Sequence, residues 1–181
     1  MNKKSNLNLT EGSIFQSLIK LALPIMASAF LSTAYSITDM AWIGKLGSKA
    51  VAGVGVGGMY VWLSQGLASL ARMGGQVHVA QALGRGDRKE AKSYANAAIQ
   101  LVMIFGMIFG AISVIFVDSL VGFYGLKDEA TVEYAKGYLM ITCGLIIFSY
   151  VGYVLTGLYT AQGDSKTPLK ANAVGLIINM I

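Results

Sequence analysis

The 181-residue sequence is 55% hydrophobic and only 13% charged. A soluble domain carries roughly 25% charged residues, so this composition excludes an ordinary soluble domain and indicates a membrane protein. The formal net charge of +5 does not indicate nucleic-acid binding, because the basic residues are dispersed among short loops instead of forming a patch.

Long uncharged stretches divide the sequence into candidate membrane-spanning helices. Charged residues are absent from residues 21–38, 50–71, 93–117, 137–163 and 171–181, apart from the sites discussed below. Each of the first four stretches is long enough to cross a hydrocarbon core of about 30 Å as a helix. The fifth is still apolar at Ile181, so we expect the sequence to be a fragment that ends inside a fifth transmembrane helix.

These stretches predict an all-α integral membrane protein with about five transmembrane helices. Residues 1–13 are a polar lead, and residues 14–181 are expected to form an incomplete transmembrane bundle. We expect spans at about residues 14–43, 51–83, 94–117, 138–160 and, cut short, 168–181.

The basic residues predict how the helices are oriented in the membrane. The N-terminal lead and the loops around residues 85–92 and 166–170 are rich in Lys and Arg, whereas the opposite loops mix fewer basic residues with acids. Loops rich in Lys and Arg stay on the cytoplasmic side, so the N-terminus is expected in the cytoplasm. The single Cys143 excludes a disulfide within this chain.

The first span contains a proline and an acid inside apolar sequence. Pro24 removes a backbone hydrogen bond and favours a kink. Asp39 is a candidate functional residue, because a carboxylate at a bilayer centre costs from about 2.5 kcal/mol upward. The alternative is an interfacial acid near the outer end of the helix, since Gly44 lies only about 7 Å farther along.

The second span is rich in small residues. Gly53 and Gly57 stand four apart, a spacing that lets helices approach closely. Residues 53–58 superficially resemble a nucleotide-binding loop, but they lie in an apolar span without a preceding strand, so we interpret them as a packing surface. Arg72 is expected to extend to the cytoplasmic interface, and a deep functional arginine is the alternative.

The rest of the chain offers fewer candidates. Residues 118–137 form the largest external segment, in which residues 128–133 are typical of the acidic first turn of a helix. Tyr150 and Tyr153 share one helical face; lining of a substrate cavity and aromatic packing are both open for them. Residues 161–168 break the fourth span from the fifth, with Pro168 at a position suited to an early helical turn.

Three segments together resemble the multidrug and toxic compound extrusion (MATE) family of transporters. They are Asp39–Gly47 after the first span, Val79–Asp87 at the end of the second, and Gln162–Pro168 before the fifth. They occur in the family's order and spacing, and the resemblance covers nearly the whole chain. It implies two six-helix bundles around a central cavity that opens alternately to either side. This chain would be most of the first bundle, ending before its sixth helix.

The resemblance also implies roles for particular residues. Asp39 matches the family's first-helix acid, which takes part in proton or sodium coupling, and Tyr35 matches a cavity tyrosine one turn earlier. Asn179 matches the asparagine of an Asn-x-x-x-Asp pattern whose acid would lie two positions beyond Ile181. The cation-coupling residues expected in this chain are therefore Asp39, Tyr35 and Asn179.

The expected function is cation-coupled antiport that exports cationic amphiphilic drugs or toxins across a bacterial cell membrane, by a monomeric full-length protein. The coupling ion would be a proton or sodium, with no other cofactor. The alternatives are a flippase of lipid-linked precursors and a non-transporting membrane scaffold. Neither an enzyme nor a metal site is expected, because one His and one Cys stand without an acid group at ligand spacing.

Overall fold

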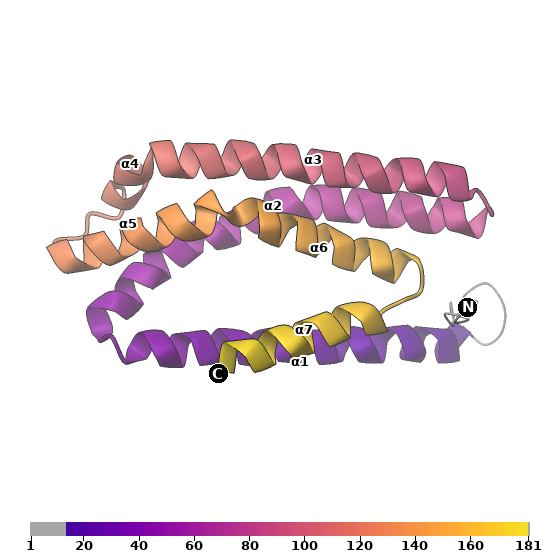
Figure 1. The fold of residues 1–181 in the computed structure, drawn as a ribbon, viewed down its shortest axis with the longest axis horizontal. Coiled ribbons are helices and arrows are strands. Elements are labelled where there is room, and N and C mark those ends of the chain that lie inside the picture. Colours follow the sequence, from indigo (N-terminus) through magenta and orange to yellow (C-terminus); the bar gives the residue numbers. More distant parts are fainter. Residues whose placement is uncertain (1–13, 181) are drawn as a thin grey trace.

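The computed structural model describes residues 14–180, and within this range the chain forms helices and turns without strands (Figure 1). The helices are α1 (Ile14–Gly44), α2 (Ser48–Gly84), α3 (Arg88–Ile115), α4 (Val117–Gly122), α5 (Glu129–Gly144), α6 (Ile146–Ala161) and α7 (Lys166–Met180). The all-α fold class predicted from the sequence is therefore confirmed.

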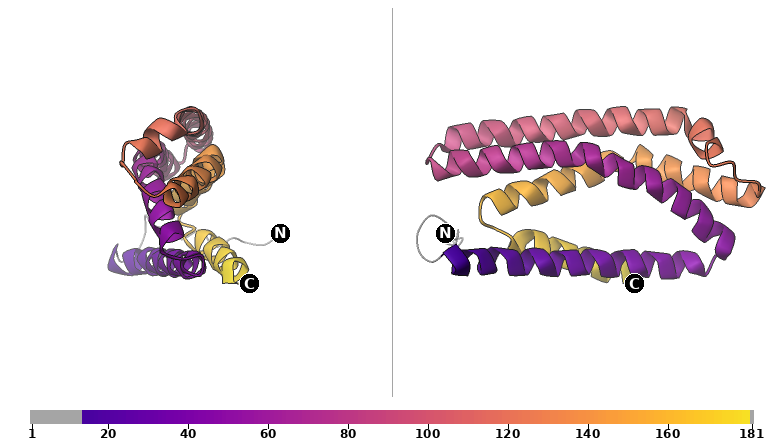
Figure 2. Two further views of the ribbon diagram at one scale, coloured as in Figure 1. Left: turned by 90° about the vertical axis from the view of Figure 1, so that its left-hand side faces the viewer. Right: turned by 180° about the vertical axis from the view of Figure 1, so that it is seen from behind.

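The helices form two groups. Helices α2, α3, α5 and α6 pack into one bundle, whereas α7 lies along α1 (Figure 1). Figure 2 shows from two further directions that the α1–α7 pair lies on the side of α2 and α6 opposite α3. The pair meets the bundle through a small number of contacts, of α1 with α2 and of α7 with α6.

Helix length and composition identify the candidate membrane spans. Phe15–Gly44 and Arg88–Ile115 are each long and apolar enough to cross a membrane, and the bent pair α5–α6 makes a third candidate if it is one span. The predicted spans at residues 51–83 and 168–181 fall on helices Ser48–Gly84 and Lys166–Met180. None of the spanning window of α1 is buried, so this helix offers its apolar sides to lipid or to other protein.

Two glycines of α2 allow α5 to pack closely against that helix, in agreement with the close helix approach that their spacing predicted. A Cβ atom added to Gly53 would lie 2.7 Å from Tyr134 Cβ and 2.9 Å from the Thr131 carbonyl oxygen. A Cβ atom at Gly57 would lie 2.5 Å from the ring of Tyr138. Such contacts leave no space for a larger residue, so the packing interpretation of these two glycines is confirmed.

The fourth predicted span differs from the observed structure. Residues 138–160 were expected to form one helix, but α5 already begins at Glu129 and the chain bends by 51° between α5 and α6. The bend sits on glycines of α3: a Cβ atom at Gly110 would lie 2.9 Å from the Cys143 carbonyl oxygen, and one at Gly106 would lie 3.1 Å from Ile147 Cα. Close packing against α3 thus accommodates the break. The apolar pattern of residues 129–161 does not reveal the break, because it depends on residues of another helix.

Side-chain hydroxyls of α1 bond back to its own backbone. Ser32, Thr33, Ser36 and Thr38 each donate to the carbonyl oxygen four residues earlier, at 2.9–3.1 Å. These bonds satisfy hydroxyls in an apolar setting and can bend a helix slightly. Helix α1 continues without interruption through Pro24, and a functional bend there remains a prediction.

Two helices begin at aspartate side chains that accept hydrogen bonds from backbone N–H groups of the first turn. Asp128 accepts a hydrogen bond from the Thr131 backbone N–H at 2.9 Å and caps α5, so the acidic first turn is confirmed. Asp164 does the same for Thr167 at 3.0 Å, and Pro168 follows in the first turn of α7. Gly47 has a φ of +99° in the turn from α1 to α2, a conformation that favours glycine.

Candidate cation site between α1 and α7

The centre of the site is a contact between Asp39 of α1 and Asn179 of α7. The Asn179 amide nitrogen donates a hydrogen bond of 2.6 Å to Asp39 Oδ1, across 140 positions of sequence. Helices α1 and α7 run alongside each other here (Figure 1). The structure therefore brings together two of the three residues that the family resemblance implied for cation coupling.

The pair holds an acceptor group that its neighbours do not satisfy. The Asn179 carbonyl oxygen is buried and has no hydrogen-bond partner. Among residues 14–180, none of the ion pairs that form includes Asp39. A half-buried carboxylate beside a buried amide oxygen is a donor set that attracts a proton or a small cation.

The side-chain amide of Asn179 can form a hydrogen bond to Asp39 whether the Asp39 carboxyl group is anionic or protonated. Its nitrogen donates to an anionic carboxylate, and its oxygen accepts from a protonated one or ligates a cation. Rotation of the amide therefore exchanges one partner for the other without moving a helix. This arrangement can register whether Asp39 is charged or neutralised.

Tyr35 lies one turn before Asp39 but is not joined to it in this structure. Its side chain is 41% exposed, and within the described part of the chain it makes no hydrogen bond to Asp39. The hydroxyls on α1 that do form hydrogen bonds reach only the helix's own carbonyl groups. Tyr35 is thus near the pair in sequence without belonging to its hydrogen-bonded core.

A pocket of about 340 Å³ lies near Asp39, although neither Asp39 nor Asn179 is among its lining residues. Its lining consists of apolar side chains, glycines and one tyrosine: Met40, Val54, Gly55, Gly58, Met59, Trp62 and Tyr138. Met40 directly follows Asp39, and Tyr138 is within range of electrostatic interaction with Asp39. An apolar wall beside an acid is suited to a hydrophobic cation.

Sequence reasoning missed Tyr138 as a pocket residue. It was one of several tyrosines in the fourth predicted span, and its place depends on α5 packing against Gly57 of α2. The absence of a side chain at Gly57 indicates that a large side chain of another helix packs against this position. That signal does not identify the partner before the helices are assembled.

The two predicted cavity tyrosines have other surroundings. Tyr150 is 2% exposed in the core, and its hydroxyl donates a 2.6 Å hydrogen bond to the Ser64 carbonyl oxygen. Tyr153 is half-buried, with the Arg72 guanidinium 4.5 Å above the centre of its ring. Neither residue belongs to the pocket beside Asp39 in this structure.

Comparison with known proteins shows the family to which this architecture belongs. The family model described as MatE matches residues 24–181, so the chain belongs to the MatE family of membrane transporters. The resemblance that the three sequence segments indicated is therefore confirmed.

Individual relatives agree with this assignment. The chain is 31% identical over 168 residues to a probable multidrug resistance protein NorM of Thermotoga maritima, covering 92% of this chain and 36% of the relative. It is 27% identical to a probable multidrug resistance protein YpnP of Bacillus subtilis, covering 96% of this chain and 39% of the relative. The chain thus spans well under half the length of these relatives.

A solved structure shares the fold. A crystal structure of a MATE protein in complex with MaD3S superposes with a TM-score of 0.89 at 24% identity, covering 99% of this chain and 40% of that one. At this identity the likeness establishes the arrangement of helices and nothing about substrates.

Proposed function

We propose that the full-length protein containing this chain is an antiporter that uses a proton or sodium gradient to export cationic amphiphilic drugs or toxins. The observation that carries the proposal is the Asp39–Asn179 pair, a carboxylate and a buried unpaired amide oxygen without a basic partner in the described chain. The names of the relatives from Thermotoga maritima and Bacillus subtilis, both called probable multidrug resistance proteins, support export of drugs.

The coupling follows from competition for Asp39. An anionic Asp39 in a half-buried setting favours a cationic neighbour, because an unpaired buried charge is penalised. A hydrophobic cation in the adjacent pocket meets this demand from one side, and a proton or sodium ion meets it from the other. When the ion neutralises Asp39, the substrate loses its electrostatic partner and is released.

The helix arrangement gives this neutralisation a mechanical consequence. Asp39 and Asn179 join α1 to α7, and this pair is set apart from the main bundle (Figure 2). Changing the charge of Asp39 alters which packing of α1 against its neighbours is most stable. Antiport then requires that ion and substrate each discriminate between the two packings.

The pocket composition favours cationic substrates over lipid-linked pyrophosphates. A flippase of such precursors needs basic residues to meet the pyrophosphate, and the lining of the pocket beside Asp39 contains none. A non-transporting scaffold remains the other alternative, and measurement of transport separates it from both.

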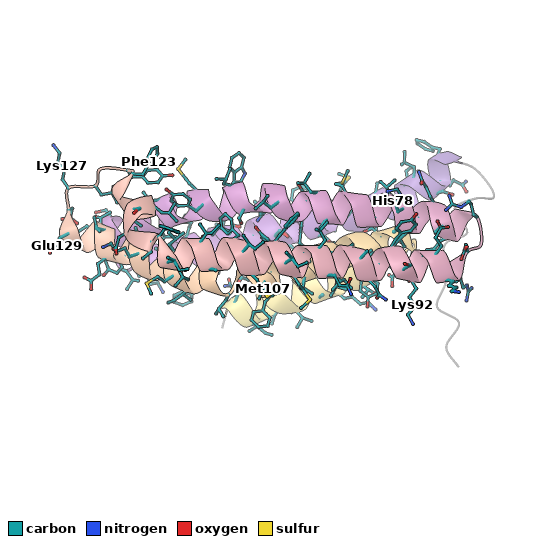
Figure 3. The ribbon with its side chains drawn as sticks, turned by 90° about the horizontal axis from the view of Figure 1, so that it is seen from above. His78, Lys92, Met107, Phe123, Lys127 and Glu129 are labelled. Atoms are coloured by element: carbon teal, nitrogen blue, oxygen red, sulfur yellow. The ribbon has the colours of Figure 1, made fainter. Side chains whose placement is uncertain are left out.

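We propose that the full-length protein is a monomer in the bacterial cell membrane with a cytoplasmic N-terminus. Figure 3 shows Lys92 and His78 at one end of the helices, and Phe123, Lys127 and Glu129 at the other. The end with Lys92 also carries Arg85, Arg88 and Lys89, so the excess of basic loop residues supports this end as the cytoplasmic one.

The proposal is tested by replacing the acid in the full-length protein. Asp39→Asn retains size and hydrogen bonding but fixes the neutral state. We expect this variant to insert normally and to lose gradient-driven export of a cationic dye from membrane vesicles. Asp118→Asn, which removes an exposed carboxylate of the short helix α4 that pairs with Lys136, is the matched control and should export at the wild-type rate. Wild-type export by Asp39→Asn would show that Asp39 is an interfacial acid.

A further inference from the structure

Arg72 of α2 is a basic residue inside the helix bundle that the proposed coupling does not use. Its Nε atom is buried and has no hydrogen-bond partner. Within residues 14–180, the ion pairs that form leave Arg72 without an acid. Buried polar groups are normally paired, so an unpaired guanidinium nitrogen calls for an explanation.

Two residues of α6 hold this side chain in place. The guanidinium carbon lies 4.5 Å above the centre of the Tyr153 ring, a distance at which a cation is attracted to an aromatic face. The stem of Arg72 occupies the space left by Gly157, where an added Cβ atom would lie 2.8 Å from Arg72 Cγ and 3.3 Å from Nε. The guanidinium is therefore oriented before any ligand arrives.

The position of Arg72 on α2 gives it a polar neighbour. Gln76 is one turn later, and its Oε1 would lie 3.2 Å from the same added Cβ atom. His78, in contrast, stacks on Tyr94 of α3. Arg72 and Gln76 thus occupy the flank of α2 that faces α6, away from α3. The α1–α7 pair lies on the side of α2 and α6 opposite α3 (Figure 1).

The site is separate from the acid on α1. Arg72 lies about 36 Å along α2 from its start at Ser48, at 1.5 Å per residue, whereas Asp39 is near the end of α1 that leads into Ser48. Gly157 is only about 6 Å from the end of α6 at Ala161, which is on the side with the basic loops. The guanidinium therefore lies in the half of the bundle nearest those loops.

We propose that Arg72, oriented by Tyr153 and Gly157 and assisted by Gln76, is a binding subsite for an oxyanion, namely a phosphate or carboxylate group. A guanidinium presents several N–H donors in a plane that matches such a group, and it keeps its charge under all ordinary conditions. Both a lipid headgroup and a soluble phosphate offer this chemistry. The proposal concerns binding and does not depend on coupling at Asp39.

The test uses the full-length protein in two arms. In the lipid arm, native mass spectrometry counts the phosphatidylglycerol molecules retained after purification. In the soluble arm, inorganic phosphate is titrated into protein in non-ionic maltoside detergent, and the shift in thermal unfolding is compared with potassium chloride at equal ionic strength. The variants are Arg72→Gln, Arg72→Lys and Tyr153→Leu. Arg88→Gln, which removes an exposed arginine at the start of α3, is the control.

Arg72→Gln should weaken binding by about tenfold or more in one arm, because charge-assisted hydrogen bonds are lost. Arg72→Lys and Tyr153→Leu keep a positive charge at residue 72 and should lose binding to a smaller extent. If Arg72→Gln does not fold, these two variants test the proposal in its place. Loss confined to phosphatidylglycerol identifies a lipid headgroup, and loss confined to inorganic phosphate identifies a soluble ligand. Binding equal to wild type and to Arg88→Gln in both arms, for every folded variant, overturns the proposal.

Discussion

Asp39 accepts one hydrogen bond from Asn179. This bond predicts how strongly substitutions at and around Asp39 should reduce export. Asn179→Ala removes a donor and a ligand oxygen but leaves the charge. We expect it to lower gradient-driven dye export by about tenfold or more, the scale of one hydrogen bond to a charged group. Tyr35→Phe should change export by less than Asn179→Ala, because Tyr35 makes no hydrogen bond to Asp39 among the described residues.

Initial export rates in vesicles with equal amounts of inserted protein give this order directly. The expected ranking of loss is Asp39→Asn, then Asn179→Ala, then Tyr35→Phe. A larger loss for Tyr35→Phe than for Asn179→Ala would mean that the tyrosine, not the asparagine, is the partner of Asp39 in the working protein.

Asp128, in the turn before α5, gives a pH-dependent prediction. The pKa of this carboxyl is lowered to about 2. The largest cause is a hydrogen bond from Lys49, and hydrogen bonds from the Thr131 side chain and backbone lower the pKa further. A depressed pKa in the folded state means that the anion stabilises the fold above its unfolded pKa of about 4. This contribution should be lost as the pH falls from about 4 toward 2.

The variant Asp128→Asn isolates the charge, because Asn is also a good helix N-cap. The thermal unfolding midpoint of the full-length wild type should exceed that of the variant at pH 5, and the difference should shrink as the pH is lowered toward about 2.5. High salt should reduce the difference at pH 5, since the ion pair is exposed. A difference that stays constant over this pH range would contradict the assigned cause.

At the scale of helices, the bend between α5 and α6 depends on the absence of side chains on α3. Gly110→Ala would place a Cβ atom 2.9 Å from the Cys143 backbone oxygen, which cannot move as a flexible side chain does. We expect the full-length protein to be destabilised by about 1–3 kcal/mol, the usual cost of overpacking.

Gly152→Ala is the matched control for this prediction, because nothing lies within 4 Å of a Cβ atom added there on α6. It should leave the unfolding midpoint unchanged or raise it slightly, since alanine favours a helix. The measurement is thermal unfolding in detergent followed by fluorescence. Equal midpoints for the two variants would show that the contact between α3 and the bend does not constrain the protein.

The sequence predicted helices far better than it predicted contacts between them. Uncharged runs and the acidic first turn at residues 128–133 are local properties, so the helical fold class and several helix starts could be predicted. The bend near Leu145, the burial of Tyr150 against Ser64 and the exposure of Tyr138 to the pocket each depend on the residue that faces them from another helix. Asp39 and Asn179 were predicted together only because a family resemblance supplied the long-range information.

At the scale of the whole molecule, the alternation of basic and less basic loops predicts the topology. In a background with Cys143→Ala, a cysteine placed next to Arg88 should react with an impermeant maleimide only from the cytoplasmic side. A cysteine next to Glu129 should react only from outside, because these residues begin α3 and α5 at opposite ends of the bundle (Figure 3).

Labelling of intact cells and of inverted vesicles distinguishes the two sides. The reverse pattern would invert the molecule, and would place the Asp39 end of α1 toward the cytoplasm. Labelling of both sites from one side would contradict the arrangement of α3 as a membrane-crossing helix.

The central claim is that ion and substrate compete through Asp39, and equilibrium binding tests it most directly. Binding of a cationic dye to the full-length protein in detergent is measured over a series of proton and sodium concentrations. For the wild type and for Asp118→Asn, we predict that one of these ions weakens dye binding by about 5- to 150-fold, the usual range of coupling between two sites. For Asp39→Asn, dye binding should be weak and independent of that ion. The same ion dependence in Asp39→Asn as in the wild type would contradict the claim.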